Sequence, residues 1–216
     1  MNILEEKQTK ATKYYDRFSI VYDWISSKSY YKKPRDFAFE KLNLSNNQLV
    51  LNIPCGTGQN FEYYQKFLSN SGKIIGIDLS QGMLEKAKEK IKKNNWNNIQ
   101  TFKENATKID SEWIKKEFKA ELKFESIFCD LGLSGFPKWE EVIDNLISLL
   151  KTNGKIVIMD WYIEKPSFRG NFIKWIGKGE VNRKLYQYLE NKVNNFELNN
   201  SFKNGQMFVA SGTKKG

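Results

Sequence analysis

The sequence contains no histidine among its 216 residues. Histidine is the side chain that most often serves as a general base near neutral pH, and it is the most common metal ligand. The sequence also lacks any cluster of cysteine and acidic residues at metal-ligand spacing. We therefore predict no metal site, and we expect any base that the protein needs to be a carboxylate or a tyrosine.

Cysteine and long apolar runs are also scarce. The two cysteines, Cys55 and Cys129, form neither a C-x-x-C pattern nor a disulfide framework. No run of 18 apolar residues is present, and the opening "MNILEEKQTKATKYY" lacks the apolar centre of a signal peptide. These features predict a reduced, cytoplasmic protein.

Acidic residues are too few to balance the basic ones, so the net charge is +10. Only four of the 35 basic residues are arginines. Proteins that read phosphates tend to use more arginine, because its guanidinium binds them in a bidentate manner. Two interpretations stay open: a lysine-rich composition that accompanies many asparagines and isoleucines, and a functional basic face.

What the sequence does contain is a regular alternation of strand and helix patterns. Strands are expected at 48–53, 73–78, 98–104, 124–132, 154–161, 196–202 and 206–214, and helices at 14–25, 60–68, 80–95 and 139–151, with a short one after Pro34. The alternation predicts an α/β fold with a doubly wound, mostly parallel, seven-stranded sheet covered on both faces.

The same patterns predict one domain over residues 1–216. A helical lid (1–44) precedes a central core (45–161). Residues 162–216 then supply two helical pieces and a C-terminal hairpin turned at Asn204-Gly205. Ser80 is expected to cap the long helix that follows the second strand.

A glycine turn in "VLNIPCGTGQNF" (residues 50–61) is the most informative motif. Gly56 and Gly58 let the backbone approach a ligand and offer amide donors to it. Asp78 lies at the tip of the second strand, where an acid can hold the hydroxyls of a ribose. The turn lacks the third glycine of a dinucleotide site and the Lys-Ser/Thr of a P-loop. The expected ligand therefore has a ribose but no pyrophosphate.

On these motifs the chain resembles the class I S-adenosylmethionine-dependent methyltransferases, from about residue 14 to residue 212. "VLNIPCGTG" is similar to the first motif of that family, "IIGIDLSQGMLEKAKEK" to the second and "FKENATKI" to the third. The resemblance implies S-adenosylmethionine as cofactor, with its amino-acid portion at the glycine turn and its ribose at Asp78. It implies a set of cofactor-binding residues: Tyr14, Tyr22, Asn52, Pro54, Gly56, Gly58, Asn60, Asp78, Leu79, Met83, Asn105, Ala106, Cys129 and Leu131.

Two positions depart from the family pattern. Where this chain has Asn52 and Asn105, the family usually has an acid, and an amide keeps the acceptor oxygen but loses the charge. Asp130 is a nearby acid that can compensate for this loss. If Asp130 does not compensate, the two asparagines predict weaker binding of the cofactor, or a protein that binds the cofactor without catalysing methyl transfer.

The methyl acceptor is less constrained than the cofactor. Methyl transfer mostly needs alignment, and an amine acceptor demands less of a base than a phenol or an enol carbon. Because histidine is absent, an amine is favoured. The catalytic candidates are Tyr15, Tyr31 and Asp130, with Asp16, Asp160 and Tyr30 also available.

The front segment "YYDRFSIVYDWISSKSYYKKPRDFAFEKL" is similar to the front helices of phospholipid and quinone methyltransferases. "GTGQNF" and "FVASGTK" look more like the bacterial phosphatidylethanolamine N-methyltransferases. This resemblance implies a lipid-headgroup amine or another small molecule as acceptor. A quinone-type C-methyltransferase and a soluble small-molecule methyltransferase remain alternatives. No N-P-P-Y-like element follows the fourth strand, so we expect no nucleic-acid partner.

Residues 168–188 interleave aromatic and apolar side chains with lysines and arginines. A segment of this kind suits peripheral contact with an anionic membrane. An ordinary amphipathic helix, with its aromatic side chains covering the sheet and its lysines in solvent, gives the same pattern. Both interpretations stay open.

Overall fold

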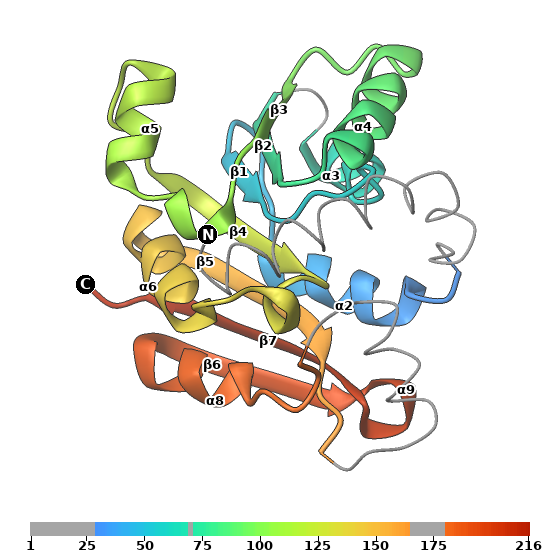
Figure 1. Cartoon of the computed structure of the whole chain (residues 1–216), viewed down its shortest axis with the longest axis vertical. Helices are drawn as coiled ribbons and strands as arrows, with labels where there is room; N and C mark the ends of the chain where they lie inside the picture. The colour runs from blue at the N-terminus through green and yellow to red at the C-terminus, as the bar shows by residue number, and fades with distance from the viewer. Residues whose placement is uncertain (1–28, 69–70, 165–179) are drawn as a thin grey trace, which may run out of the picture.

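The computed structural model describes residues 29–68, 71–164 and 180–216 (Figure 1). The strands are β1 (Leu49–Asn52), β2 (Lys73–Asp78), β3 (Ile99–Lys103), β4 (Phe124–Asp130), β5 (Leu150–Trp161), β6 (Val193–Ser201) and β7 (Met207–Lys214). The helices are α2 (Lys32–Leu42), α3 (Phe61–Leu68), α4 (Gln81–Lys93), α5 (Ser111–Phe118), α6 (Trp139–Leu149), α8 (Leu185–Lys192) and the short α9 (Phe202–Gly205), with 3-10 turns η1 (Ala106–Lys108) and η2 (Leu133–Gly135).

The seven strands form one sheet in the order β3-β2-β1-β4-β5-β7-β6. β1 to β5 are parallel to one another, whereas β7 runs antiparallel to β5 and to β6. The chain therefore starts in the middle, winds outward to β3, and returns to the other side of β1. This confirms the predicted doubly wound, mostly parallel, seven-stranded sheet. Ligands of such sheets lie beyond the carboxyl ends of the strands, where the winding reverses between β1 and β4.

Helices cover both faces of the sheet (Figure 1). Successive strand residues point to opposite faces, so neighbouring residues such as Val50 and Leu51 enter different cores. Leu51 packs in the cluster that contains residues of α5, α6 and α8, and Val50 in the cluster that contains residues of α2, α3 and α4. Both faces are apolar, which explains why these strands read as continuous hydrophobic runs.

Two helices differ from the sequence prediction. α2 begins at Lys32 and so contains Pro34, because proline is tolerated in the first turn of a helix, where the N–H has no helical partner. α5 was not predicted at all. Only Ile114 of this short helix is buried, so it shows little periodicity, although Asp110 caps it by accepting a hydrogen bond from the backbone N–H of Trp113 (2.8 Å).

Two strands begin earlier than the patterns predicted. β5 starts at Leu150, which is buried and pairs with Phe124 before the register shifts. The predicted turn at Gly154 therefore lies inside the strand as an irregularity. β6 starts at Val193 and not at residue 196 as predicted, because the Val193 side chain is buried and the residue pairs with Lys214.

The C-terminal hairpin is confirmed, and its turn packs near the front of the chain. Asn204 and Gly205 both have positive φ (59° and 77°), as the predicted turn requires. The ring of Phe202 at the turn lies 5.7 Å from that of Phe37 on α2, measured between centroids. Further along the hairpin, Glu197 pairs with Lys41 at 2.6 Å. The hairpin therefore extends the sheet and contacts α2.

Candidate functional site

The glycine turn connects β1 to α3 and needs its two glycines for different reasons. Gly56 and Gly58 have φ of +53° and +75°, a region that other residues adopt at a cost of about 1–2 kcal/mol. A Cβ at Gly58 would lie 2.5 Å from a ring carbon of Phe61, whereas a Cβ at Gly56 would meet nothing within 4 Å. Gly58 therefore serves packing, and Gly56 borders open space that a ligand can use.

Asp78 connects this turn to the next helix. One carboxylate oxygen accepts from the backbone N–H of Gly56 and the other from that of Ser80, both at 2.9 Å. Ser80 is the predicted N-cap of α4, and its hydroxyl accepts from the N–H of Met83 at 3.2 Å. A carboxylate oxygen has two acceptor positions, so these bonds are compatible with further bonds to ribose hydroxyls.

The residues predicted to surround an adenine lie along the tips of β2 and β3. The two tips are adjacent, because Glu104 N–H donates to the carbonyl oxygen of Asp78 at 3.1 Å. Leu79 is half-buried, Met83 is buried, and Asn105 caps η1 through its side-chain oxygen, which accepts from Thr107 N–H at 3.1 Å. Ala106, the first residue of that turn, is buried beneath.

A buried polar network lies where β1 and β4 end. Asn52 is fully buried, and its amide donates to the carbonyl oxygen of Phe128 at 3.3 Å. The Asn60 amide nitrogen contacts both the Asn52 side-chain oxygen (3.3 Å) and Asp130 Oδ2 (2.9 Å). Asp130 Oδ2 also accepts from Arg35 Nη2 at 3.1 Å. The structure thus brings together three residues that were predicted from the sequence, Asn52, Asn60 and Asp130, and one that was not, Arg35.

Arg35 was missed, although a signal was available. It lies four residues before Phe39 and seven before Leu42, which puts an arginine on the apolar face of α2. Its side chain is only 2% exposed. An arginine on the buried face of a helix, in a chain that otherwise favours lysine, points to a specific partner.

The remaining titratable groups of this region are shielded from solvent. Burial raises the pKa of both the Cys55 and the Cys129 thiol well above its usual value, so neither is a thiolate at neutral pH. Burial also raises the pKa of Asp160 to about 6, against the opposing effect of its hydrogen bonds. Asp160 accepts from the N–H and the hydroxyl of Ser134 at 2.9 and 3.0 Å, so it holds η2 beside the end of β5.

A small apolar cluster lies where β5 ends and β7 begins. Its buried members are Trp161, Ile163 and Met207, with Tyr31 and Leu131 among the half-buried side chains packed against them. The rings of Tyr31 and Trp161 meet edge to face, with centroids 6.2 Å apart. Of the three predicted catalytic candidates, Tyr31 therefore lies in this cluster and Asp130 in the polar network.

Three other predicted site residues lie outside the described residues, and a fourth, Pro54, packs against a neighbouring loop. Tyr14, Tyr15 and Tyr22 belong to residues 1–28, which the structure does not describe. Pro54 is half-buried and packs closely on the loop after β4, since a Cβ at Gly132 would lie 2.4 Å from its ring.

Most of the basic and aromatic segment, residues 165–179, also lies outside the described residues. In its described part, Leu185 is fully buried, and Arg183 donates to the carbonyl oxygen of Phe136 at 2.6 Å. Tyr188 donates to Asp144 at 2.9 Å. These side chains face the body of the protein. None of the helices in the described ranges has the length and apolar character needed to span a membrane.

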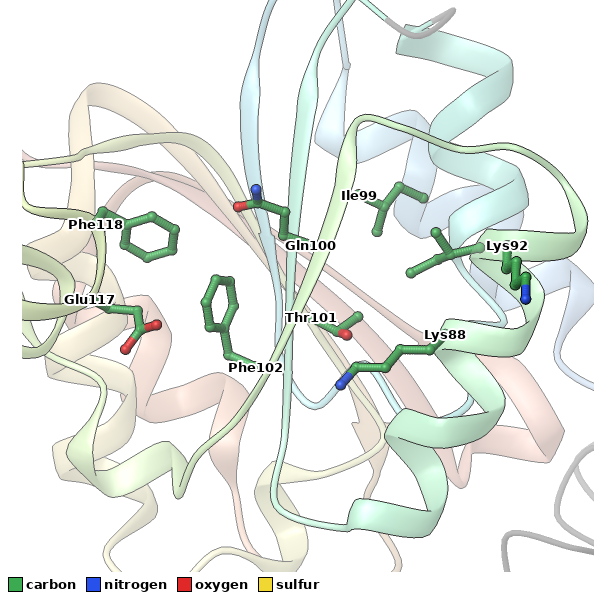
Figure 2. Close-up of a pocket in the computed structure, with 9 residues that line it drawn as sticks. Lys88, Lys92, Ile99, Gln100, Thr101, Phe102, Glu117 and Phe118 are labelled. Atoms are coloured by element: carbon green, nitrogen blue, oxygen red, sulfur yellow. The ribbon is translucent and has the colours of Figure 1, made fainter.

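A separate surface hollow of about 660 Å³ lies at the edge of the sheet. It runs along β3 between α4 and α5, and Figure 2 shows Phe102 and Phe118 on one side of the strand and Lys88 on the other. None of its lining residues belongs to the predicted site. The glycine turn, and not this hollow, carries the expected ligand chemistry.

Known proteins resemble this chain in both sequence and fold. The sequence model of a family described as "Methyltransferase domain" matches residues 44–206, well over half of the chain. A demethylmenaquinone methyltransferase of Oceanobacillus iheyensis is 25% identical over 146 residues, covering 68% of this chain and 56% of that protein. The enzyme of the same name from Lactococcus lactis is 28% identical over 156 residues, covering 68% and 59%.

Among solved structures, phosphoethanolamine N-methyltransferase 2 of Haemonchus contortus, in complex with S-adenosyl-L-methionine, superposes with a TM-score of 0.71 at 13% identity. The superposition covers 93% of this chain and 57% of that one. At this identity the match shows a shared fold. The chain spans less than two thirds of each of these three relatives.

Proposed function

Because the chain belongs to the methyltransferase domain family, whose cofactor is S-adenosylmethionine, we propose that it methylates an apolar ring of the demethylmenaquinone type. The observation that supports this acceptor is the apolar cluster of Trp161, Ile163 and Met207, where β5 ends and β7 begins. The names of the sequence relatives support the same acceptor.

The glycine turn and Asp78 would hold the cofactor. The open space at Gly56 admits a ligand against the backbone, and Asp78 stands at the position that holds a ribose. Leu79 and Met83 offer apolar contact to the adenine, and Asn105 offers a polar group to its amine. When bound, the cofactor supplies an electrophilic methyl group on a sulfonium.

The chain's own contribution to transfer is alignment and exclusion of water. The apolar cluster would remove water from the acceptor side, and the half-buried Tyr31 packs against it. Asp160 acts on this side as a positioning residue, because it is 1% exposed and its oxygens bind Ser134 and the N–H of Trp161 (2.7 Å).

A lipid amine is the second candidate acceptor, and one observation favours it. The half-buried Tyr31 ring packs against the apolar cluster and already has the Arg35 guanidinium carbon 5.9 Å from its centroid, so this ring attracts cations. The absence of histidine fits an amine, which needs little help to lose its proton. Peripheral contact with an anionic membrane would serve either acceptor, and residues 165–179 are the segment proposed for it.

A transfer assay with methyl-labelled S-adenosylmethionine separates the candidates. The acceptors are a demethylated naphthoquinol with a short isoprenoid chain, phosphatidylethanolamine vesicles and soluble phosphoethanolamine. We expect label in the naphthoquinol, and we expect Trp161→Ala to raise the KM for it without changing cofactor affinity. Label in an amine alone would replace the first candidate by the second. No label in any acceptor, with cofactor binding intact, would leave a binding protein without these activities.

A further inference from the structure

The turn of the C-terminal hairpin contains a lysine in a backbone conformation that lysine seldom adopts. Lys203 has φ of 54° and ψ of 43°, and Asn204 after it has φ of 59° and ψ of 43°. This left-handed conformation suits glycine and asparagine, whereas a lysine adopts it only at a cost. The turn would form more readily with an asparagine at position 203, so turn formation does not explain the lysine. Such an outlier points to a role for the side chain.

The Lys203 side chain reaches the start of α2, 173 residues away in the sequence. Its ammonium donates a hydrogen bond to the backbone carbonyl oxygen of Tyr30 and lies 3.5 Å from the centroid of the Tyr30 ring. Tyr31, the next residue, is the N-cap of α2, and its side chain makes no capping hydrogen bond. The position of this helix start therefore depends on contacts from elsewhere, and Lys203 supplies two of them.

A row of aromatic rings connects Tyr30 to the apolar cluster where β5 ends and β7 begins. The rings of Tyr30 and Tyr31 meet edge to face, with centroids 4.9 Å apart. The Tyr31 ring meets that of Trp161 in the same manner, at 6.2 Å. Phe202, which precedes Lys203 in the turn, also packs against this cluster. Tyr31 therefore contacts both the buried Trp161 and Tyr30, and the position of Tyr30 is fixed by Lys203.

The contacts of Lys203 contribute little to stability, because they lie near solvent. Tyr30 is 37% exposed, and Lys203 is half-buried. Cation–π contacts and charged hydrogen bonds at such positions contribute little net free energy. Their main consequence is geometric, since they hold the hairpin turn and the start of α2 together beside Tyr31.

We propose that Lys203 is a positioning residue for the methyl acceptor: by fixing Tyr30 it sets the Tyr31 ring against Trp161, and so completes the apolar wall that faces the acceptor. The inference rests on the proposed function, because it takes the apolar cluster around Trp161 as the acceptor's site. Lys203 acts through the two tyrosines and does not touch the acceptor. Acceptor binding therefore depends on the C-terminal hairpin as well as on the core of the sheet.

Transfer kinetics with the demethylated naphthoquinol and methyl-labelled S-adenosylmethionine test this role. Lys203→Met removes the ammonium and keeps the length of the side chain, and we expect it to raise the KM for the naphthoquinol about fivefold with kcat unchanged. Lys203→Arg should restore the KM to within about twofold of the wild type, because a guanidinium also donates hydrogen bonds and stacks on aromatic rings. An unchanged KM in Lys203→Met, or no rescue by arginine, overturns the proposal.

Two further variants separate positioning from charge and from turn stability. Lys192→Met removes an ammonium that lies 4.8 Å from the centroid of the Tyr188 ring on α8, and it should leave the KM unchanged. A rise equal to that of Lys203→Met would mean that net charge alone matters, which overturns the proposal. Lys203→Asn suits the left-handed turn, so urea denaturation should show it to be more stable than Lys203→Met, while the KM rises in both. A wild-type KM in Lys203→Asn also overturns the proposal.

Fluorine NMR, with fluorotyrosine incorporated in place of Tyr31, tests the geometry without any acceptor. We expect the resonance to shift in Lys203→Met and to stay in place in Lys192→Met, and an unchanged resonance in both variants overturns the proposal. If the wild type does not label the naphthoquinol although this shift is seen, the proposed function fails, and the role in acceptor binding fails with it. If the wild type labels the naphthoquinol and Lys203→Met changes neither the resonance nor the KM, this inference alone fails.

Discussion

The buried carboxyl of Asp160 should make the protein less stable as the pH rises, which is the opposite of the usual effect of an acidic residue. This carboxyl is 1% exposed, and burial raises its pKa from an ordinary 3.8 to about 6, with the charge of Asp130 adding to the effect. Three hydrogen bonds, two from Ser134 and one from Trp161, act in the opposite direction. Because the pKa is raised in the folded state, the stability from this group is fully present below about pH 4. It is lost as the pH rises to about 6.

The size of the effect follows from the shift. A change from 3.8 to about 6 is roughly two pKa units, and each is worth about 1.36 kcal/mol, so the loss is ~3 kcal/mol. Asp160→Asn removes the titration and keeps the shape of the side chain. Part of this loss has occurred by pH 4, so we expect the unfolding free energy of the wild type, minus that of the variant, to fall by about 2–3 kcal/mol between pH 4 and pH 7.

Urea denaturation of both proteins at pH 4, 5, 6 and 7 measures this difference, and other titrating groups cancel in it. Ser134→Ala is the matched variant. It removes one hydroxyl donor, so the pKa of Asp160 should rise further and the loss should extend to higher pH. A difference that stays constant, or that grows with pH, would refute the reasoning. It would mean that the hydrogen bonds outweigh burial.

Three further predictions concern the turn, the front of the chain and the membrane. Gly56→Ala should cost about 1–2 kcal/mol of stability and most of the affinity for S-adenosylmethionine. Gly58→Ala should cost more stability than Gly56→Ala, because its Cβ would meet the Phe61 ring; urea denaturation measures the loss of stability and calorimetry the loss of affinity. Residues 14–35 should exchange amide hydrogens more slowly with cofactor bound, and equal exchange with and without cofactor would make them a plain structural helix instead of a lid. The protein should co-sediment with anionic vesicles at 0.1 M salt and dissociate from them at 1 M salt, because the Debye length falls from about 10 Å to about 3 Å. Charge reversal at Lys174 and Lys178 should abolish co-sedimentation, and a wild-type protein that does not co-sediment at low salt would contradict the membrane prediction.

The fold and the backbone conformation of the glycine turn were predictable because their signals are local. Each buried strand is a short apolar run, and each turn residue has a backbone requirement that its own type reveals. Gly56 and Gly58 have the positive φ that a tight turn needs, and Asp78 stands at a strand tip whose position follows from the strand itself. The helix cap at Ser80 is local in the same sense.

The buried ion pair of Arg35 and Asp130 was not predictable, because it depends on two residues 95 positions apart. The residues that flank Asp130 in the sequence do not indicate that Arg35 of α2 donates a hydrogen bond to it. The helix α5 was missed for the opposite reason. It buries one residue only, so its helical conformation depends on its cap and on the ring contact between Trp113 and Phe102 (5.9 Å), which joins it to the edge strand.

The central claim is that S-adenosylmethionine binds at the glycine turn with its ribose on Asp78. Calorimetric titration of the cofactor into the wild type, Asp78→Ala and the control Asp110→Ala tests it most directly. Asp110 is also a helix-capping acid, but it caps α5, which packs on the face of the sheet opposite to α3 and α4. We predict wild-type affinity for Asp110→Ala and a loss of about 1–3 kcal/mol of binding free energy for Asp78→Ala, because the ribose hydroxyls lose their acceptor. Equal affinity of Asp78→Ala and the wild type would contradict the account.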